Sequence, residues 1–155
     1  AHIGLQKYRA KGTVRSKSAD PAIAPEIRFN LFEEPSDQQR LVYAIRHMEN
    51  VFRQQAFDEF CGERTFPGPD VRSDDDLKTW LSIYAGCAHH SSASCRMGSP
   101  DEGSSVVDST CRVIGLEGLR VVDASVMPEI VNSNTHATVV MIAEKAAEMI
   151  IQGKR

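Results

Sequence analysis

The stretch Leu119-Arg120-Val121-Val122-Asp123-Ala124-Ser125-Val126-Met127-Pro128 decides the fold, together with the segment that follows it. Its apolar start predicts a buried strand that ends at Asp123. After a loop that reaches Asn134, helical periodicity runs from about Thr135 to Gln152, and Gly153 is a typical helix stop. The predicted buried stripe of this last helix consists of Val139, Ile142, Ala143, Ala146, Ala147 and Ile150.

The first part of the chain predicts a small antiparallel sheet followed by two helices. Residues 12–15 and 27–30 alternate in polarity on either side of a turn-forming segment. Ser36 and Gln39 have the spacing of a capping box and predict the start of the first helix. Ser73 predicts the start of the second. Residues 74–76 are acidic, which suits the first turn of a helix, and no further ligands follow at calcium-loop spacing.

Composition excludes some classes of function. The 155 residues carry 18 Lys and Arg against 21 Asp and Glu, and no basic stripe is visible, so a nucleic-acid partner is not expected. No apolar run approaches the roughly 20 residues of a membrane-spanning helix. The four cysteines favour free thiols over a disulfide framework, which fits a cytoplasmic protein.

Two short stretches concentrate the reactive side chains. Residues 87–95 are rich in His, Ser and Cys, and residues 132–136 precede the last helix. A metal site formed by Cys87, His89 or His90, and Cys95 lacks standard zinc spacing. A Ser or Cys nucleophile lacks a Gly-x-Ser-x-Gly turn. A general base at His90, beside a helix N-terminus that stabilises negative charge, is the third reading, and purely structural histidines are the fourth.

Several ordered motifs resemble the C-terminal region of the glucose–methanol–choline (GMC) oxidoreductases, especially the branch that oxidises choline and primary alcohols. The substrate-domain strands of that family resemble residues 12–15, 18–21 and 28–30. The remaining motifs are Cys95-Arg96-Met97-Gly98, Val106-Val107-Asp108, the run from residue 113 to 128, Asn134-Thr135 and the run from residue 141 to 147.

The resemblance implies an α+β fold. Residues 1–98 are expected to form the C-terminal part of an antiparallel-sheet substrate domain with helices. Residues 99–155 are expected to supply the strand and helix that complete a Rossmann-like FAD-binding domain. The implied reaction is oxidation of an alcohol to an aldehyde with hydride transfer to FAD, and oxygen or a quinone as the final electron acceptor.

The resemblance also implies residue roles. His90, five residues before Cys95, takes the hydroxyl proton of the alcohol, and Asn134 is the second catalytic residue. The implied cofactor-binding residues are His89, Asp123, Ala124, Asn134, Thr135 and His136. No metal ligand is implied.

Three positions depart from the family pattern. Ala93-Ser94 stands where the family usually has Gly-Thr, His89 stands where an aromatic residue is frequent, and His136 replaces the usual Asn or Gln. We expect these differences to alter the shape of the substrate pocket or the environment of the flavin, and to leave the class of reaction unchanged.

The ten glycines include no Gly-x-Gly-x-x-Gly spacing for the ADP half of FAD. We therefore expect an N-terminal FAD-binding portion or a second chain to supply it, and we expect this chain alone to bind flavin weakly and to be inactive. Two alternatives remain: a flavin-containing hydroxynitrile lyase of the same family, and a non-catalytic fragment that needs a partner chain.

Overall fold

The structure, a computed structural model, describes residues 2–153 and divides the chain into two compact units between Gly86 and Cys87. The first unit contains β1 (Thr13–Arg15), β2 (Glu26–Arg28), α1 (Pro35–Phe52), the short 3₁₀ helix η1 (Gln55–Phe57) and α2 (Asp74–Tyr84). The second contains the 3₁₀ turn η2 (Ala124–Val126) and α3 (His136–Ile151). The mixed α and β content agrees with the expected fold class. The division into substrate and FAD domains at residues 98 and 99 stays a prediction.

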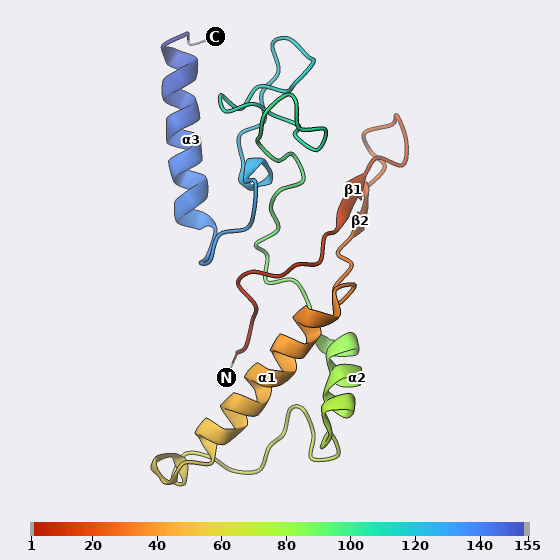
Figure 1. Cartoon of the computed structure of the whole chain (residues 1–155), viewed down its shortest axis with the longest axis vertical. Helices are drawn as coiled ribbons and strands as arrows, with labels where there is room; N and C mark the ends of the chain where they lie inside the picture. Colours follow the sequence, from red (N-terminus) through yellow and green to blue (C-terminus); the bar gives the residue numbers. More distant parts are fainter. Residues whose placement is uncertain (1, 154–155) are drawn as a thin grey trace. The chain divides into compact units, whose positions relative to one another are not determined.

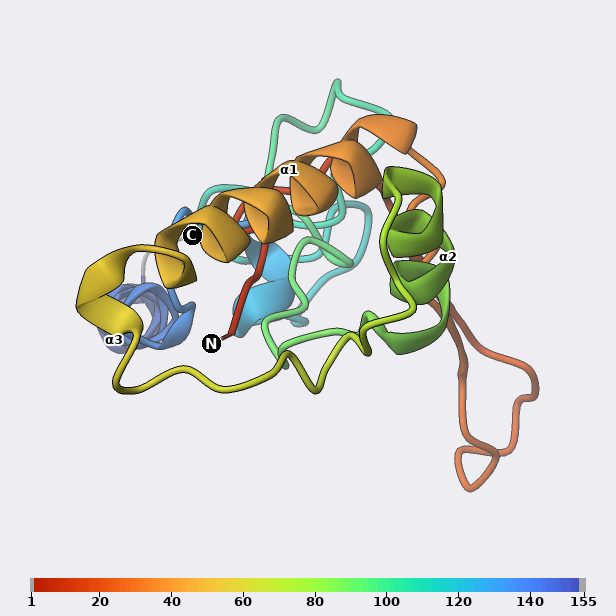
Figure 2. The same cartoon turned by 90° about the horizontal axis from the view of Figure 1, so that it is seen from below.

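The predicted hairpin is present. β1 and β2 pair antiparallel with Val14 opposite Ile27, and the loop between them projects away from α1 and α2 (Figure 1, Figure 2). A Cβ atom on Gly12 would lie 2.2 Å from the Arg28 carbonyl oxygen, so only glycine allows the strands to approach this closely.

The core of the first unit lies between α1 and α2. Val42 and Ile45 of α1 pack with Leu77 and Leu81 of α2, and Leu77 is completely buried. Polar bonds hold the same two helices: Gln38 donates to the Lys78 carbonyl oxygen at 2.9 Å, and Arg46 forms an ion pair with Asp74 at 2.9 Å. Apolar side chains of both helices therefore meet at this interface.

The start of α1 differs from the prediction. The helix begins at Pro35 with Glu34 as its N-cap, and Ser36 is inside the first turn with its hydroxyl buried and without a hydrogen-bond partner. Proline suits the first helical position because its missing N–H would be unbonded there in any case. The buried carboxylate of Asp37 instead accepts hydrogen bonds from the backbone N–H groups of Arg9, at 2.7 Å, and Ala10, at 2.9 Å.

The start of α2 is as predicted. The Ser73 hydroxyl accepts from the Asp76 N–H at 3.0 Å, and the Asp76 carboxylate accepts from the Ser73 N–H at 2.7 Å. The backbone hydrogen bond from Ser73 is the main reason that the pKa of Asp76 is lowered. The Asp76 carboxylate and the Ser73 hydroxyl thus cap the helix start.

The second unit has few regular elements, and the predicted strand before Asp123 is not formed. Arg112 and Arg120 form one isolated bridge, Leu119 is 49% exposed, and residues 120–122 are half-buried. A strand needs a neighbour that bonds along its length, and within residues 2–153 this segment has a single bridge position. The Rossmann-like arrangement of this segment stays a prediction.

The last helix occupies the predicted residues. α3 is followed by Gly153, whose φ of +62° and N–H bond to the Ile150 carbonyl oxygen (3.1 Å) end it as expected. Of the predicted stripe, Ala146 is buried and Val139 and Ile142 are half-buried, whereas Ala143, Ala147 and Ile150 are exposed. Within residues 2–153, the buried face of α3 is therefore narrower than the predicted stripe. None of the described helices is both long and apolar enough to cross a membrane.

Asp108 organises a turn in the second unit. One of its carboxylate oxygens accepts from the N–H of Thr110 (2.7 Å), the hydroxyl of Thr110 (2.7 Å) and the N–H of Arg112 (3.0 Å). Burial by itself raises the pKa of Asp108, but the hydrogen bonds from Thr110 and Arg112 together outweigh it and lower the pKa.

Replacing Asp108 with alanine is expected to lower the free energy of unfolding of the second unit by about 1–3 kcal/mol at neutral pH, because the donors of Thr110 and Arg112 lose their acceptor. Since folding lowers the pKa of Asp108, its contribution is present above the unfolded-state pKa and disappears as the pH falls through the folded-state pKa. The difference in the free energy of unfolding between Asp108→Ala and the wild type should thus become smaller below about pH 4. Urea unfolding followed by circular dichroism measures it, with the exposed Asp101→Ala as control; equal stability of the two variants contradicts the prediction.

Candidate active site

The segment that carries His90 is held against the turn after Asp123. The backbone N–H groups of alternate residues donate to successive carbonyl oxygens of η2: Ala93 to Ala124 at 3.4 Å, Cys95 to Ser125 at 3.0 Å and Met97 to Val126 at 2.8 Å. Val126 is completely buried, so this turn is anchored in the core of the second unit. The short polar stretch that the sequence singles out is thus a fixed loop.

His90 itself reaches the start of α3. Its Nδ1 lies 2.9 Å from the hydroxyl oxygen of Thr135, a residue 45 positions later in the chain. His90 is half-buried and Thr135 is 7% exposed. The two stretches that concentrate the reactive side chains are therefore joined by one hydrogen bond.

Thr135 is the N-cap residue of α3, but it does not cap the helix. Its backbone is in the right-handed helical region (φ −74°, ψ −15°), and α3 has no side-chain cap hydrogen bond. An N-cap threonine usually has an extended backbone and accepts from an N–H in the first turn. Here the first-turn amide groups have no capping side chain, while the threonine hydroxyl bonds to His90.

Three other predicted site residues are next to Thr135 or His90 in the sequence. Asn134 and His136 flank Thr135 and are exposed. His89 is also exposed and has a φ of +62°, which bends the backbone next to His90. Their predicted roles in binding or catalysis stay predictions.

Asp123 and Ala124 have structural partners. The exposed Asp123 caps η2 through its side chain, which accepts from the Ser125 N–H at 2.7 Å. The half-buried Ala124 accepts from the N–H groups of Ala93, at 3.4 Å, and Met127, at 3.3 Å, through its carbonyl oxygen. A cofactor contact of either residue stays a prediction.

The contact that sequence reasoning missed is the one made by the Thr135 hydroxyl. The resemblance to the family implied only a cofactor contact for this residue. No local pattern relates two residues 45 positions apart, so only the folded chain reveals the pair.

In the described part of the chain, the cysteine residues are not gathered into a cluster of possible metal ligands. All four are free thiols; Cys111 is buried, and the Cys87 sulfur lies 3.4 Å from the Ser91 hydroxyl oxygen. Burial is the main reason that the pKa of Cys111 is raised. Over residues 2–153, no group of three or more His, Cys, Asp or Glu side chains is arranged to hold a metal ion.

Ala93 adopts a left-handed backbone with a φ of +69°. The family pattern that this segment resembles has glycine at this position, and glycine adopts such a backbone without the steric cost that a Cβ atom imposes. We expect Ala93→Gly to raise the free energy of unfolding by about 0.5–1 kcal/mol, the strain relieved minus the added freedom of the unfolded chain.

Urea unfolding followed by circular dichroism measures the change. The control is Ala147→Gly, at an exposed position inside α3, which should lower stability by about 1 kcal/mol because glycine disfavours helix interiors. Ala93→Gly lowering stability as much as Ala147→Gly contradicts the strain argument.

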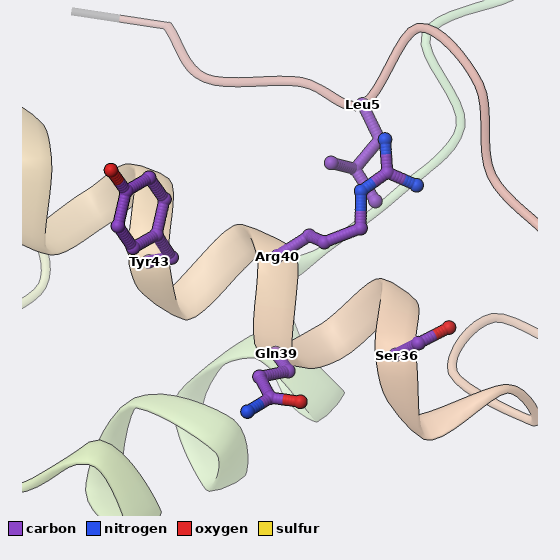
Figure 3. Close-up of a pocket in the computed structure, with 5 residues that line it drawn as sticks. All are labelled: Leu5, Ser36, Gln39, Arg40 and Tyr43. Carbon is purple, nitrogen blue, oxygen red and sulfur yellow. The ribbon is translucent and has the colours of Figure 1, made fainter.

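A separate pocket lies in the first unit, on the surface of α1 (Figure 3). Arg40 extends from the helix toward Leu5 in the N-terminal segment, and its guanidinium donates to the Lys7 carbonyl oxygen at 2.7 Å. Ser36, Gln39 and Tyr43 complete the lining. None of the predicted site residues lines this pocket, and Arg40 serves there to fasten the N-terminal segment to α1.

Comparison with known proteins identifies the family. Residues 9–143 match the GMC oxidoreductase family. The oxygen-dependent choline dehydrogenase 1 of Chromohalobacter salexigens is 43% identical over 150 residues, which are 97% of this chain and 27% of that protein. The oxygen-dependent choline dehydrogenase of Serratia proteamaculans is 44% identical over 152 residues, which are 98% of this chain and 27% of that protein.

Two solved structures of oxidases are also similar to this chain. Pyridoxine 4-oxidase from Mesorbium loti has a TM-score of 0.84 and 25% identity, over 93% of this chain and 28% of that one. A fungal aryl-alcohol oxidase has a TM-score of 0.75 and 29% identity, over 92% of this chain and 23% of that one. The chain spans just over a quarter (27%) of the length of these curated choline dehydrogenases. Because the family match covers most of its residues, the chain belongs to the GMC oxidoreductase family.

Proposed function

We propose that this chain supplies the proton-accepting part of an FAD-dependent site that oxidises a choline-like or other primary alcohol to its aldehyde. The observation that carries the proposal is the 2.9 Å bond from His90 to Thr135, which joins the loop with the expected base to the helix start with the expected Asn134. The choline dehydrogenases among the relatives support the substrate class. In this proposal, sequence that the relatives have beyond the matched part holds the ADP half of FAD.

The donors at the start of α3 fit the polar edge of a flavin. The pyrimidine ring of a flavin presents carbonyl oxygens, and reduction places negative charge there. α3 begins without a capping side chain, so its first amide groups and the positive end of its dipole are available to such a ligand. The exposed side chains of Asn134 and His136 add further donors beside them.

The residues of this chain have distinct roles in the proposed reaction. Bound FAD would supply the acceptor for the hydride of the alcohol carbon, and the proton of the O–H group would pass to a base of this chain. With Nδ1 of His90 bonded to Thr135, Nε2 is the nitrogen that receives this proton. The Asn134 carboxamide donates to the alcohol oxygen as negative charge develops and adds no competing charge.

Anaerobic mixing of the flavin-loaded protein that carries this chain with choline and simple primary alcohols tests the proposal. We expect loss of the oxidised flavin absorbance and one equivalent of aldehyde for each flavin reduced. Cleavage of a hydroxynitrile without any change in flavin absorbance indicates a lyase instead. Tight flavin binding with no reduction by any alcohol rejects the oxidation of this substrate class.

A further inference from the structure

The hydrogen bond between His90 and Thr135 constrains the imidazole as well as locating it. A neutral histidine carries its proton on one ring nitrogen only, and the partner of the other nitrogen decides which. Nδ1 of His90 lies 2.9 Å from the Thr135 hydroxyl oxygen, and a hydroxyl can accept or donate. The direction of this bond therefore determines which nitrogen has a free lone pair.

We propose that Thr135 is a positioning residue that keeps the proton of His90 on Nδ1 by accepting a hydrogen bond from it, and so leaves Nε2 free to take the proton of the substrate. The inference rests on the proposed function, since it concerns how the proposed base is prepared. A donating hydroxyl would place the proton on Nε2, where it would block the reaction.

The surroundings of Thr135 suit this role. The side chain is 7% exposed, which limits competition from water for its hydroxyl. Threonine is branched at Cβ, so few rotamers are open to it once it is packed at a helix start. Because the residue has a helical backbone and does not cap α3, its hydroxyl is directed to the imidazole at the cost of the usual N-cap contact.

The backbone that carries His90 is equally constrained. His89 and Ala93, on either side, both have left-handed backbones, with φ of +62° and +69°. The N–H of Cys95 bonds to the Ser125 carbonyl oxygen at 3.0 Å and fixes the end of the loop. The loop thus sets the place of the ring, and Thr135 sets its rotation and its tautomer.

The bond also suits the protonated state of the base. When Nε2 accepts a proton, both ring nitrogens become donors, and Nδ1 still donates to the same hydroxyl oxygen. Hydrogen bonds from an ionised donor are stronger than those from a neutral one, so the contact with Thr135 persists when Nε2 takes the proton. A valine at position 135 would offer no hydrogen-bond acceptor, and no contact there would favour one tautomer of His90.

The first readout is independent of turnover. Nitrogen NMR of the histidine-labelled protein at about pH 9, where histidine side chains are generally neutral, reports which ring nitrogen is protonated. The His90→Gln variant identifies the signals of His90 by their loss. We expect the proton on Nδ1 in the wild type and in Thr135→Ser, and a shift toward Nε2 in Thr135→Val.

The second readout is the rate of flavin reduction by the alcohol at saturating concentration. We expect Thr135→Val to lower it by about tenfold to a hundredfold, with a half-saturating concentration within about threefold of the wild type, because the base is misoriented while the substrate contacts persist. Thr135→Ser should stay within about threefold of the wild-type rate, since serine keeps the acceptor. Thr138→Val makes the same change in the first turn of α3 as a matched control and should have no effect.

A wild-type His90 that carries its proton on Nε2 overturns the inference, even if Thr135→Val fails to fold. A Thr135→Val variant with wild-type tautomer and rate does the same. These results leave the proposed function intact, because that function is tested separately, by reduction of the bound flavin with alcohols.

Discussion

Replacing His90 with alanine in the flavin-loaded protein is expected to lower the rate constant of flavin reduction by an alcohol by about 10²–10⁴, while the flavin stays bound. This is the usual contribution of a positioned general base. The loss falls on the proton-transfer step, because His90, held by its hydrogen bond to Thr135, is the proposed proton acceptor. Anaerobic stopped-flow absorbance measures the rate constant, and the visible spectrum after gel filtration measures retained flavin.

Two other histidines lie close to His90 in the chain or at the helix start, so the experiment needs controls that separate them. His89→Gln and His136→Gln test whether either neighbour is the base. The exposed His47→Ala, on α1 of the first unit, controls for loss of a histidine elsewhere. A near-normal rate in His90→Ala, with a large loss in His89→Gln or His136→Gln, moves the base to that residue.

Replacing Leu77 with alanine is expected to lower the free energy of unfolding of the first unit by about 2–5 kcal/mol. Leu77 is completely buried and packs with Val42, Ile45 and Leu81, so the shorter side chain leaves a cavity at the interface of α1 and α2. Urea unfolding followed by tryptophan fluorescence measures this directly, since Trp80 is the single tryptophan of the chain and packs against the same cluster.

Ile83→Ala is the matched control for Leu77→Ala. Ile83 lies on α2 but is 68% exposed, so its removal should change stability by no more than about 0.5 kcal/mol. Equal effects of the two substitutions would mean that the packing of α1 on α2 does not stabilise the first unit.

Features with local causes could be predicted from the sequence. The helix start at Ser73, the stop at Gly153 and the hairpin around residues 13–28 depend on neighbouring residues, and the structure has all three. The start of α1 shows the limit of such patterns. Ser36 has the spacing of a cap, but Pro35 suits the first helical position better, and the side chain of Asp37 serves the N-terminal segment instead.

Features with distant causes could not be predicted. Residues 119–123 have the composition of a buried strand, yet a strand requires a bonding neighbour, and the described chain gives Arg120 only one bridge. The number of α3 side chains that are buried likewise depends on which segments pack against the helix. Ile150, which was predicted to be buried, is 52% exposed. The composition of a segment shows which side chains it could bury. It does not show which other segments are present to cover them.

The amino-acid sequence alone determined the family, the helices and the two stretches that hold the reactive side chains, because each of these is encoded in short, ordered patterns. Only the tertiary structure decided that the Thr135 hydroxyl meets Nδ1 of His90 at 2.9 Å and that Ala93 is held at a φ of +69°. Both depend on how the loop of residues 87–98 is anchored to η2. Contacts between residues far apart in the chain follow from the packing of the whole unit, and no local pattern specifies them.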